Sequence, residues 1–468
     1  MLACLVSIWF SFFPPPIRDC VSVSPPDSYL IIHGIRIEGN RKTRPALIMR
    51  ELDITPGDTL PGTLINDALK RNKNKIFNTN LFNSVELVLL PNEYGNIDLV
   101  IQVTERWYVF PIVIFELGDR NFNEWWNERG RDLRRTNYGL RVAHKNMFGR
   151  GDQLQATAQF GFTRRFDLGY DFRYLDKAQK NGLALAVSYA TNNNVAYRTE
   201  NNKLRFLNAS DLLRERFYAS VRFTRRNRFY NQHRVEGRFH YNRISDTIAR
   251  LNPGYFLDGR TRQQYGYLSY EFVHDRRDQM AYPLRGRYAA AEVERLGLLP
   301  GDGVGKTIVR ANFALFGQVG EKYFWNFNVR AMATSPARQP YNEYRALGFG
   351  LEYLRGYENY LIDGQHFALL KTTFKRELFS AEFALPQLVP LRQFQTVPVA
   401  VYVCVFSDYG YVYDPMRNPG NSRLANTWLF STGAGVDVVT FYNVVLRLNY
   451  AVNRQGDRGV FFNFASDI

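Results

Sequence analysis

Catalytic residue types are present in this 468-residue chain, but their spacing forms no enzymatic site. The six histidines show neither the HxH nor the HExxH spacing of a zinc centre. Ser407 and Asp408 are adjacent, and in the strand expected there they face opposite sides, which prevents a hydrogen-bonded dyad. The chain also lacks a G-x-S-x-G elbow, a P-loop and a CxxC pair, since its three cysteines are Cys4, Cys20 and Cys404. We therefore expect no enzymatic activity, no metal site and no cofactor.

The sequence "YLRGYENYLIDG" (353–364) carries the strongest candidate for a specific polar contact. Arginine presents a planar fork that binds a carboxylate through two parallel hydrogen bonds. Gly356 lets the backbone turn tightly or approach another wall closely, and Tyr357 can lie along such a wall if its hydroxyl finds a partner. Arg355 is therefore either an ordinary solvated loop cation or a cation placed to reach one particular carboxylate. The elements around it decide between these two readings.

Composition and charge narrow the class of protein. The net charge is +16, from 60 Lys+Arg against 44 Asp+Glu. A nucleic-acid-binding protein would gather these cations in one domain, whereas here arginine is spread along the chain, so we expect no nucleic-acid partner. Aromatic residues make up 15%, with 36 Phe and 29 Tyr, which is typical of a membrane β-barrel with aromatic girdles.

The first residues, "MLACLVSIWFSFF", are apolar and precede three prolines. They lack a basic start but resemble the apolar core of a secretory signal, so we expect residues 1–26 to be a signal or leader segment. Past residue 20 no apolar run approaches the roughly 20 residues of a spanning helix. A membrane location would therefore require a β-barrel.

Residues 28–105 differ from the rest and predict a small α+β domain in the order β-α-α-β-β. The β-branched stretch "YLIIHGIRIEGN" predicts a first strand that ends in a Gly-Asn turn. Thr43 is the expected N-cap of the first helix, with Pro45 in its first turn. A strand hairpin is expected across residues 92–96. Apolar residues at helical spacing predict the second helix, namely Leu64, Ala68, Leu69 and Ile76.

This region resembles a POTRA domain, the periplasmic module of outer-membrane assembly and translocation proteins. The resemblance is carried by Gly39, Asn40, Thr43, "REL" (50–52), Gly57, "IFNTNLFNSVEL" (76–87, with Asn78, Leu81 and Phe82) and "VIQVTE" (100–105). It implies that the second strand of the mixed sheet is an edge to which an extended client can add by β-augmentation.

Residues 107–468 alternate with a period of two, which predicts β-strands. In "YFWNFNVRA" (323–331), apolar side chains alternate with Asn326, Asn328 and Arg330. Roughly 360 residues of such strands are too many for a barrel filled by side chains, because large barrels open a lumen. Apolar faces turned to lipid and polar faces turned to a wet interior satisfy both sets of residues.

Sixteen strands can be placed by working back from the C-terminus, with short connections alternating with long ones. The long connections include residues 245–262, 335–365 and 414–423. Short periplasmic turns and long external loops are the pattern of bacterial barrels, and an even count returns the last strand to the side where the chain entered. Strand edges are least defined over residues 191–215. The expected fold is mainly β: a sixteen-stranded transmembrane antiparallel barrel preceded by one POTRA domain.

The barrel region resembles the bacterial surface antigen barrel of the BamA/TamA superfamily. Five stretches carry this resemblance in the expected order: 138–161 with turn residues Gly149, Gly151 and Asp152; 274–287 with Asp275, Asp278, Pro283 and Gly286; "LRGYENYLIDG" with Arg355, Gly356 and Tyr357; "VFSDYGYVY" (405–413) with Asp408 and Gly410; and the terminal strand signal "GVFFNFASDI" with Gly459, Phe462 and Phe464.

The resemblance implies that the Arg355 loop folds into the barrel and that Arg355 pairs with Asp408 of strand thirteen. Relatives often carry a glutamate in strand twelve as a second partner for the arginine. The nearest position here is Thr373, with Glu377 four residues on, so the sequence predicts that this second carboxylate is absent. Removing one partner of such a partly desolvated pair costs more than the intact pair contributes.

The resemblance implies an assembly or translocation factor in the outer membrane of a Gram-negative-type bacterium, with its POTRA domain in the periplasm. Its expected partners are unfolded outer-membrane or secreted client proteins and outer-membrane lipid, with assembly-machinery lipoproteins as a further candidate. Clients would pair at a seam between the first strand (about 108–117) and the last (about 459–465). The alternative is a passive channel or surface structural barrel without insertase activity, whose Arg- and Asn-lined lumen would favour anionic solutes.

Overall fold

The computed structural model describes residues 29–94, 96–118, 125–126, 130–350, 352–384, 396–418, 420–421, 423–440 and 444–465. The expected leader, residues 1–26, lies outside the described residues. No helix in the described part of the chain is long and apolar enough to cross a membrane.

The N-terminal domain is a four-stranded mixed sheet with two helices. Its elements are β1 (Tyr29–Glu38), α1 (Pro45–Glu51), β2 (Thr59–Pro61), the 3-10 helix η1 (Gly62–Leu64), α2 (Ile65–Phe77), β3 (Phe82–Pro91) and β4 (Ile97–Glu105). The strand order is β2-β1-β4-β3, in which β1 and β4 are parallel and the other neighbours are antiparallel. The second of the three predicted strands, β3, therefore lies at an edge.

The core of this domain forms where both helices pack on the sheet. Leu81 and Phe82 are buried within it. At the end of β1, Gly39 has φ +88°, and a Cβ there would lie 2.0 Å from the Val103 carbonyl oxygen, so only glycine fits the turn. The Asn40 side chain then donates to the Thr43 carbonyl oxygen at 3.0 Å and holds the turn that leads to α1.

Three local predictions for this domain are wrong. The N-cap of α1 is Arg44, and Thr43 instead places its hydroxyl 2.9 Å from the Tyr108 hydroxyl. Leu64 is 54% exposed because it ends η1 and lies outside the buried face of α2. The short strand β2 was missed, since three residues are too few to show an alternating pattern.

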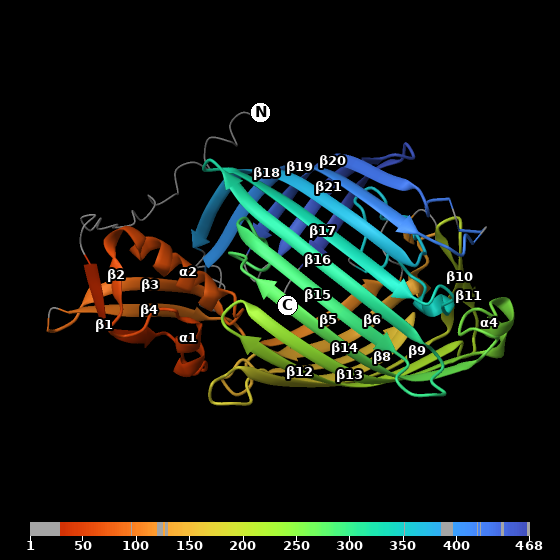
Figure 1. The fold of residues 1–468 in the computed structure, drawn as a ribbon, viewed down its shortest axis with the longest axis horizontal. Coiled ribbons are helices and arrows are strands. Elements are labelled where there is room, and N and C mark those ends of the chain that lie inside the picture. Colours follow the sequence, from red (N-terminus) through yellow and green to blue (C-terminus); the bar gives the residue numbers. More distant parts are fainter. Residues whose placement is uncertain are drawn as a thin grey trace, which may run out of the picture.

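The second region is a sixteen-stranded antiparallel sheet in the described residues, as predicted. Its strands are β5 (Val109–Leu117), β6 (Thr136–His144), β7 (Gln153–Gly161), β8 (Thr163–Phe172), β9 (Asn181–Asn192), β12 (Arg214–Asn227), β13 (Asn231–Ile244), β14 (Arg262–Asp275), β15 (Gly286–Leu296), β16 (Lys306–Val319), β17 (Tyr323–Ser335), β18 (His366–Ala384), β19 (Thr396–Tyr413), β20 (Trp428–Thr440), β21 (Val445–Asn453) and β22 (Arg458–Ala465). The sheet curls into a barrel with the N-terminal domain at one end (Figure 1). Its ladder ends at β22 and β5, so the seam lies between the last and first strands.

The predicted two faces of the strands are present. On β16, Val309 and Phe313 are 46% and 42% exposed on the outer surface. Arg310, between them in sequence, faces the other side and pairs with Glu294 of β15. The alternation therefore separates an apolar exterior from a polar interior.

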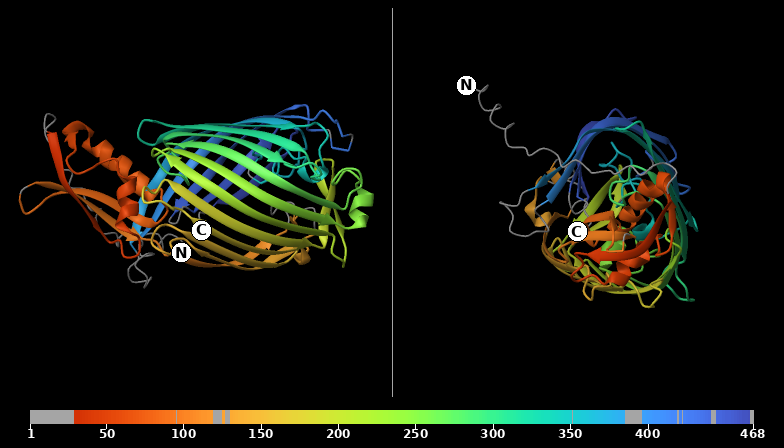
Figure 2. Two further views of the ribbon diagram at one scale, coloured as in Figure 1. Left: turned by 60° about the horizontal axis from the view of Figure 1, so that its bottom comes forward. Right: turned by 90° about the vertical axis from the view of Figure 1, so that its left-hand side faces the viewer.

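The connections at the two barrel ends differ in length and content. The end near the N-terminal domain has short turns such as 145–152 and 228–230. The far end carries long loops, α4 (Asp246–Leu251), the 3-10 helix η3 (Tyr341–Glu343) and a separate two-stranded hairpin of β10 (Asn194–Glu200) and β11 (Lys203–Asn208) (Figures 1 and 2). The ambiguous stretch 191–215 is therefore mostly this hairpin, which lies outside the barrel sheet.

Candidate functional site

The loop between β17 and β18 brings Arg355 to Asp408 on β19. The Arg355 Nε donates to Asp408 Oδ2 at 2.8 Å and Nη2 donates to Oδ1 at 2.5 Å, which is a bidentate pair. The Arg355 main-chain N–H also donates to Oδ2, at 3.2 Å. The Asp408 side chain is 0% exposed, and the guanidinium lies 3.9 Å from the Phe406 ring centroid. The two predicted partners are thus in contact, and Arg355 is not a solvated loop residue.

The neighbouring predicted residues fit the loop against the barrel wall. Gly356 has φ +82°, and a Cβ there would meet Ala451 and other side chains of the wall. The Tyr357 hydroxyl donates to the Phe430 carbonyl oxygen at 3.3 Å, and its side chain is almost fully buried. Gly410 leaves space for the loop, since a Cβ there would lie 2.7 Å from a methyl group of Leu354.

A main-chain carbonyl takes the place of the second carboxylate, which the sequence predicts to be absent. Arg355 Nη2 donates to the Thr372 oxygen at 3.2 Å. Glu377 lies elsewhere and accepts a hydrogen bond from the Tyr402 hydroxyl at 3.3 Å. The residue of strand twelve that pairs in register with Asp408 is Lys371.

The loop also holds the last hairpin of the barrel, which sequence reasoning missed. The Asn453 side-chain amide donates to the Gly356 carbonyl oxygen at 2.8 Å. The Tyr360 hydroxyl donates to Asp457 Oδ2 at 2.6 Å, in the turn between β21 and β22. No local pattern marks Asn453 or Asp457, because both partners lie 97 residues from the loop. The loop thereby connects β19 to the hairpin that ends at the seam.

The far-end hairpin covers the same loop. Asn202, between β10 and β11, exchanges hydrogen bonds with both main-chain groups of Leu361, each at 2.8 Å. The main-chain N–H of Asn202 donates to Asn421 Oδ1, and the Asn421 side-chain amide in turn donates to Asp363 Oδ2 at 2.8 Å. Burial raises the pKa of Asp363 to about 6 and that of Glu358 to about 7. The loop therefore lies between the barrel wall on one side and the β10–β11 hairpin on the other.

At the opposite end, the turn 145–152 docks against the N-terminal domain. The Arg44 N–H donates to the Gly149 carbonyl oxygen at 2.9 Å. The Asn146 side chain bridges, donating to the Thr43 hydroxyl and accepting from the Gly151 N–H. Within the same turn, Asp152 is fully buried, and its Oδ2 lies 3.6 Å from Nε of Arg150.

Close approach explains the glycine at position 149. It has φ +75°, and a Cβ there would lie 2.2 Å from the Lys42 carbonyl oxygen. The predicted turn residues thus serve a second purpose, because they form the surface on which the N-terminal domain sits.

The turn 276–285 makes a second contact with that domain. Asn78 donates to the Asp278 carbonyl oxygen at 3.0 Å and accepts from the Met280 N–H at 3.3 Å. Asp278 Oδ1 accepts from the Leu284 N–H, next to Pro283. Asp275 pairs with Arg277 at 2.6 Å, and Gly286 starts β15 with φ +106°.

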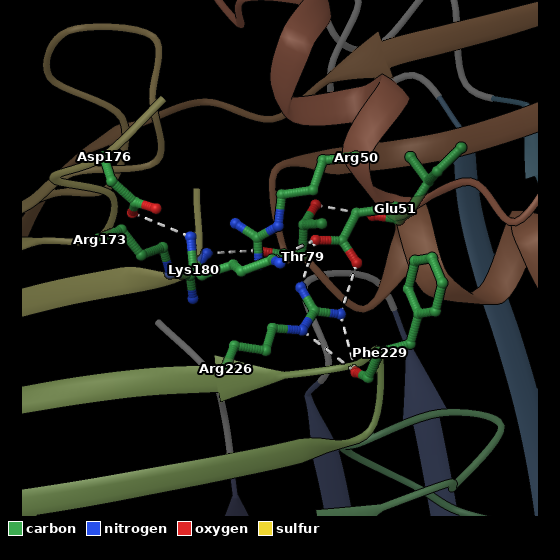
Figure 3. A network of polar contacts seen from close by, with 9 residues as sticks. Arg50, Glu51, Thr79, Arg173, Asp176, Lys180, Arg226 and Phe229 are labelled. Atoms are coloured by element: carbon green, nitrogen blue, oxygen red, sulfur yellow. Dashed lines mark hydrogen bonds and ion pairs between the residues drawn. The ribbon is translucent and has the colours of Figure 1, made fainter. Parts of the chain in front are cut away.

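An ion pair between the domains completes this junction (Figure 3). Arg226 of β12 donates to both oxygens of Glu51 on α1, at 2.6 and 2.8 Å. Arg50 lies 3.6 Å from Glu51 and stacks on the Tyr174 ring at 4.0 Å, while Arg173 donates to a main-chain oxygen of the domain. Burial opposes ionisation of Glu51, but the hydrogen bonds and charge of Arg226 and the charge of Arg50 outweigh it and hold the Glu51 pKa below its ordinary value.

The terminal strand β22 pairs with β21 along its described length. Gly459 lies opposite Ala451, and Phe462 is 66% exposed on the outer face. Phe464 pairs through its backbone with Leu446, and its side chain lies outside the described residues. In the described part of the chain, no group of three or more His, Cys, Asp or Glu residues is arranged to hold a metal ion.

Two solved structures have a fold similar to that of this chain. The chain is similar to BamA from Haemophilus ducreyi lacking POTRA domains 1–3, with 16% identity, a TM-score of 0.52, and coverage of 93% of this chain and 84% of that one. It is also similar to CdiB from Escherichia coli, with 13% identity, a TM-score of 0.54, and coverage of 93% and 76%. At these identities the likeness shows the fold alone. No curated protein matches the sequence.

Family models match two parts of the chain. Residues 30–106 match the POTRA model, described as surface antigen variable number repeat. Residues 146–466, more than half of the chain, match the Omp85 superfamily domain. The chain therefore belongs to the Omp85 superfamily of outer-membrane β-barrel proteins, which assemble or secrete other proteins.

Proposed function

We propose that this protein inserts β-barrel clients into the outer membrane or passes polypeptides across it. The POTRA domain captures an extended client at the β3 edge by β-augmentation. The seam between β5 and β22 then offers strand edges to which a client hairpin pairs. No nucleotide is required, because folding of the client into the membrane is itself downhill.

The position of β3 supports the first step. It is the outermost strand of the order β2-β1-β4-β3, and ten residues long, whereas the other edge strand, β2, has three. A strand at a sheet edge presents main-chain donors and acceptors along one side. The longer edge offers a client the longer ladder.

The observation that carries the proposal is the reach of the inner loop, residues 352–365. Arg355 binds Asp408 on β19, while Asn453 and Asp457 tie the same loop to the β21–β22 hairpin. Because β22 is one end of the ladder, the loop controls how firmly that hairpin is held. The docked loop keeps this hairpin in the position in which the seam pairs with a client, so loss of the Arg355–Asp408 pair should lower insertion.

The test is an Asp408→Asn variant, with Arg355→Ala as its partner. The protein is reconstituted in liposomes, and insertion of an unfolded β-barrel client is measured by protease protection. Both variants should reduce insertion while the barrel stays folded by circular dichroism, and the charge swap Arg355→Asp/Asp408→Arg should restore part of it. Arg338→Ala is the control, because its pair with Asp258 is exposed on the outer loops.

A passive channel makes a different prediction. If neither variant changes insertion or secretion of any client but both change ion conductance, the channel function replaces this proposal. Depletion of the protein, followed by an inventory of the outer-membrane proteins that disappear, would identify the clients.

A further inference from the structure

A cavity of about 690 Å³ lies between the POTRA domain and the luminal wall of the barrel. Helices α1 and α2 form one side, and β8, β12, β13, β14 and the turn 276–285 form the other. Figure 3 shows part of this space, where Arg50 from the POTRA domain and Arg173 and Arg226 from the barrel come together around Glu51. We call this cavity the basic chamber.

The described lining of the basic chamber is strongly cationic. Eleven of its residues are lysine or arginine and four are acidic. Some of the cations are neutralised, as Arg226 is by Glu51 and Arg277 by Asp275. In the described part of the chain, five have no carboxylate oxygen within 4.0 Å of their side-chain nitrogens, namely Arg71, Arg173, Lys180, Arg276 and Arg285. The chamber therefore holds positive charge that its own residues leave unbalanced.

The chamber faces the lumen and the periplasmic opening, away from lipid. On β12, Arg222 and Arg226 line it, whereas Val221 and Phe223 point outward and are 52% and 41% exposed. Since strand residues alternate between faces, the cations lie on the inner surface of the barrel. A ligand must reach them from the periplasm or through the lumen, which favours a polypeptide over a bilayer lipid.

We infer that the basic chamber binds an acidic, extended segment of the client polypeptide. This inference rests on the proposed function, because it assumes that a client passes from the POTRA domain toward the barrel. The client's carboxylates would pair with the unbalanced cations, and the rings of Tyr174, Tyr230 and Tyr288 supply apolar contact between them. Charge attraction of this kind speeds capture and weakens as salt rises.

The test uses two exposed cations that do not hold the POTRA domain, Lys180 and Arg276. The probe is a fluorescent Gly/Ser peptide rich in glutamate, compared with the same peptide carrying glutamine at those positions. Both are titrated against the full-length protein in nanodiscs of zwitterionic lipid. Lys180→Gln/Arg276→Gln should weaken binding of the glutamate peptide about tenfold, and added salt should weaken binding to the parent protein.

The matched control is Arg225→Gln/Arg287→Gln. These arginines lie on β12 and β15 and face the opposite side from the chamber residues Arg226 and Gly286, so the control removes the same charge from the outer surface. Binding should be unchanged in this control. Equal loss in the control, or equal binding of the glutamine peptide, overturns the inference. The inference is also overturned if Lys180→Gln/Arg276→Gln loses binding to phosphatidylglycerol vesicles and still binds the glutamate peptide.

The outcome is separable from that of the proposed function. If the glutamate peptide does not bind while Asp408→Asn still blocks client insertion, only the acidic-segment inference is removed. If the peptide binds as expected while Asp408→Asn leaves every client unaffected, the chamber is real and the proposed use of the inner loop is wrong.

Discussion

Two buried arginine–carboxylate pairs, one at the inner loop and one at the POTRA junction, use the same chemistry in different surroundings. Arg355–Asp408 and Arg226–Glu51 are both bidentate, with carboxylate side chains 0% and 4% exposed. In both, the arginine also donates to a main-chain carbonyl oxygen.

The difference lies in what else surrounds each carboxylate. At the junction, Arg50 lies 3.6 Å from Glu51, and the basic chamber adjoins the pair. At the inner loop, Arg355 is the only cation within 4.0 Å of Asp408 in the described part of the chain, and it rests on the Phe406 ring. At the inner loop the next cation, Lys371, lies opposite Asp408 in register but makes no ion pair with it within 4.0 Å, whereas at the junction a second cation, Arg50, already lies 3.6 Å from the carboxylate.

Removal of each arginine in turn tests this difference and should give the largest effects. Arg355→Gln should cost the docked loop roughly 3–5 kcal/mol, because it leaves Asp408 buried without its partner. Arg226→Gln should cost the POTRA docking clearly less, because Arg50 still neutralises Glu51. Hydrogen exchange of residues 352–365 and of α1 measures the two effects. Equal losses would show that Arg50 does not compensate for the loss of Arg226.

Substitution of one glycine at each site tests close packing. Gly149→Ala should destabilise POTRA docking by about 2–3 kcal/mol, because positive φ strains alanine and its Cβ would meet the Lys42 carbonyl oxygen. Gly356→Ala should cost only about 1–2 kcal/mol, since its nearest neighbour, a methyl group of Ala451, lies at 3.2 Å. Exchange rates of α1 and of the inner loop report the two effects. A larger effect at Gly356 would reverse the ranking.

A smaller change tests whether the inner loop holds the last hairpin. Tyr360→Phe removes the hydrogen bond to Asp457 and should cost about 1 kcal/mol. The expected result is faster hydrogen exchange in β21 and β22 with no change in α1. Tyr94→Phe is the control, because Tyr94 is 86% exposed in the POTRA hairpin. Unchanged exchange of β21 and β22 would show that the loop does not anchor them.

Acidity should affect the two sites in opposite directions. The Glu51 pKa is lowered, so its contribution to docking is present above its ordinary value of 4.5 and is lost as pH falls through the lowered pKa. Burial raises the Glu358 pKa to about 7, so its contribution to loop stability is full below 4.5 and is lost as pH rises through 7. Glu358→Gln should remove the part of the loop's pH response near pH 7 and leave the part near pH 6 that comes from Asp363, as measured by loop protection against proteases.

Much of the architecture could be predicted because it follows from local pattern. Alternation in β16 and β17 determines which side chains face lipid, and the positions of long and short connections determine which barrel end is which. The Arg355–Asp408 contact is predicted only by the resemblance to a family, and no local pattern indicates it. The predicted cap at Thr43 failed because tertiary partners, Tyr108 and Asn146, bind its hydroxyl.

The POTRA domain, the sixteen strands and their two faces follow from the sequence, because period-two and helical patterns act over neighbouring residues. The way in which these parts are joined follows from the tertiary structure alone. Arg226 meets Glu51 across 175 residues, Asn78 meets Asp278 across 200, and Asn453 meets Gly356 across 97. Such contacts leave no periodic signal, because they depend on barrel closure bringing distant turns to one rim. Closure likewise creates the basic chamber, by gathering arginines that appear evenly scattered along the chain.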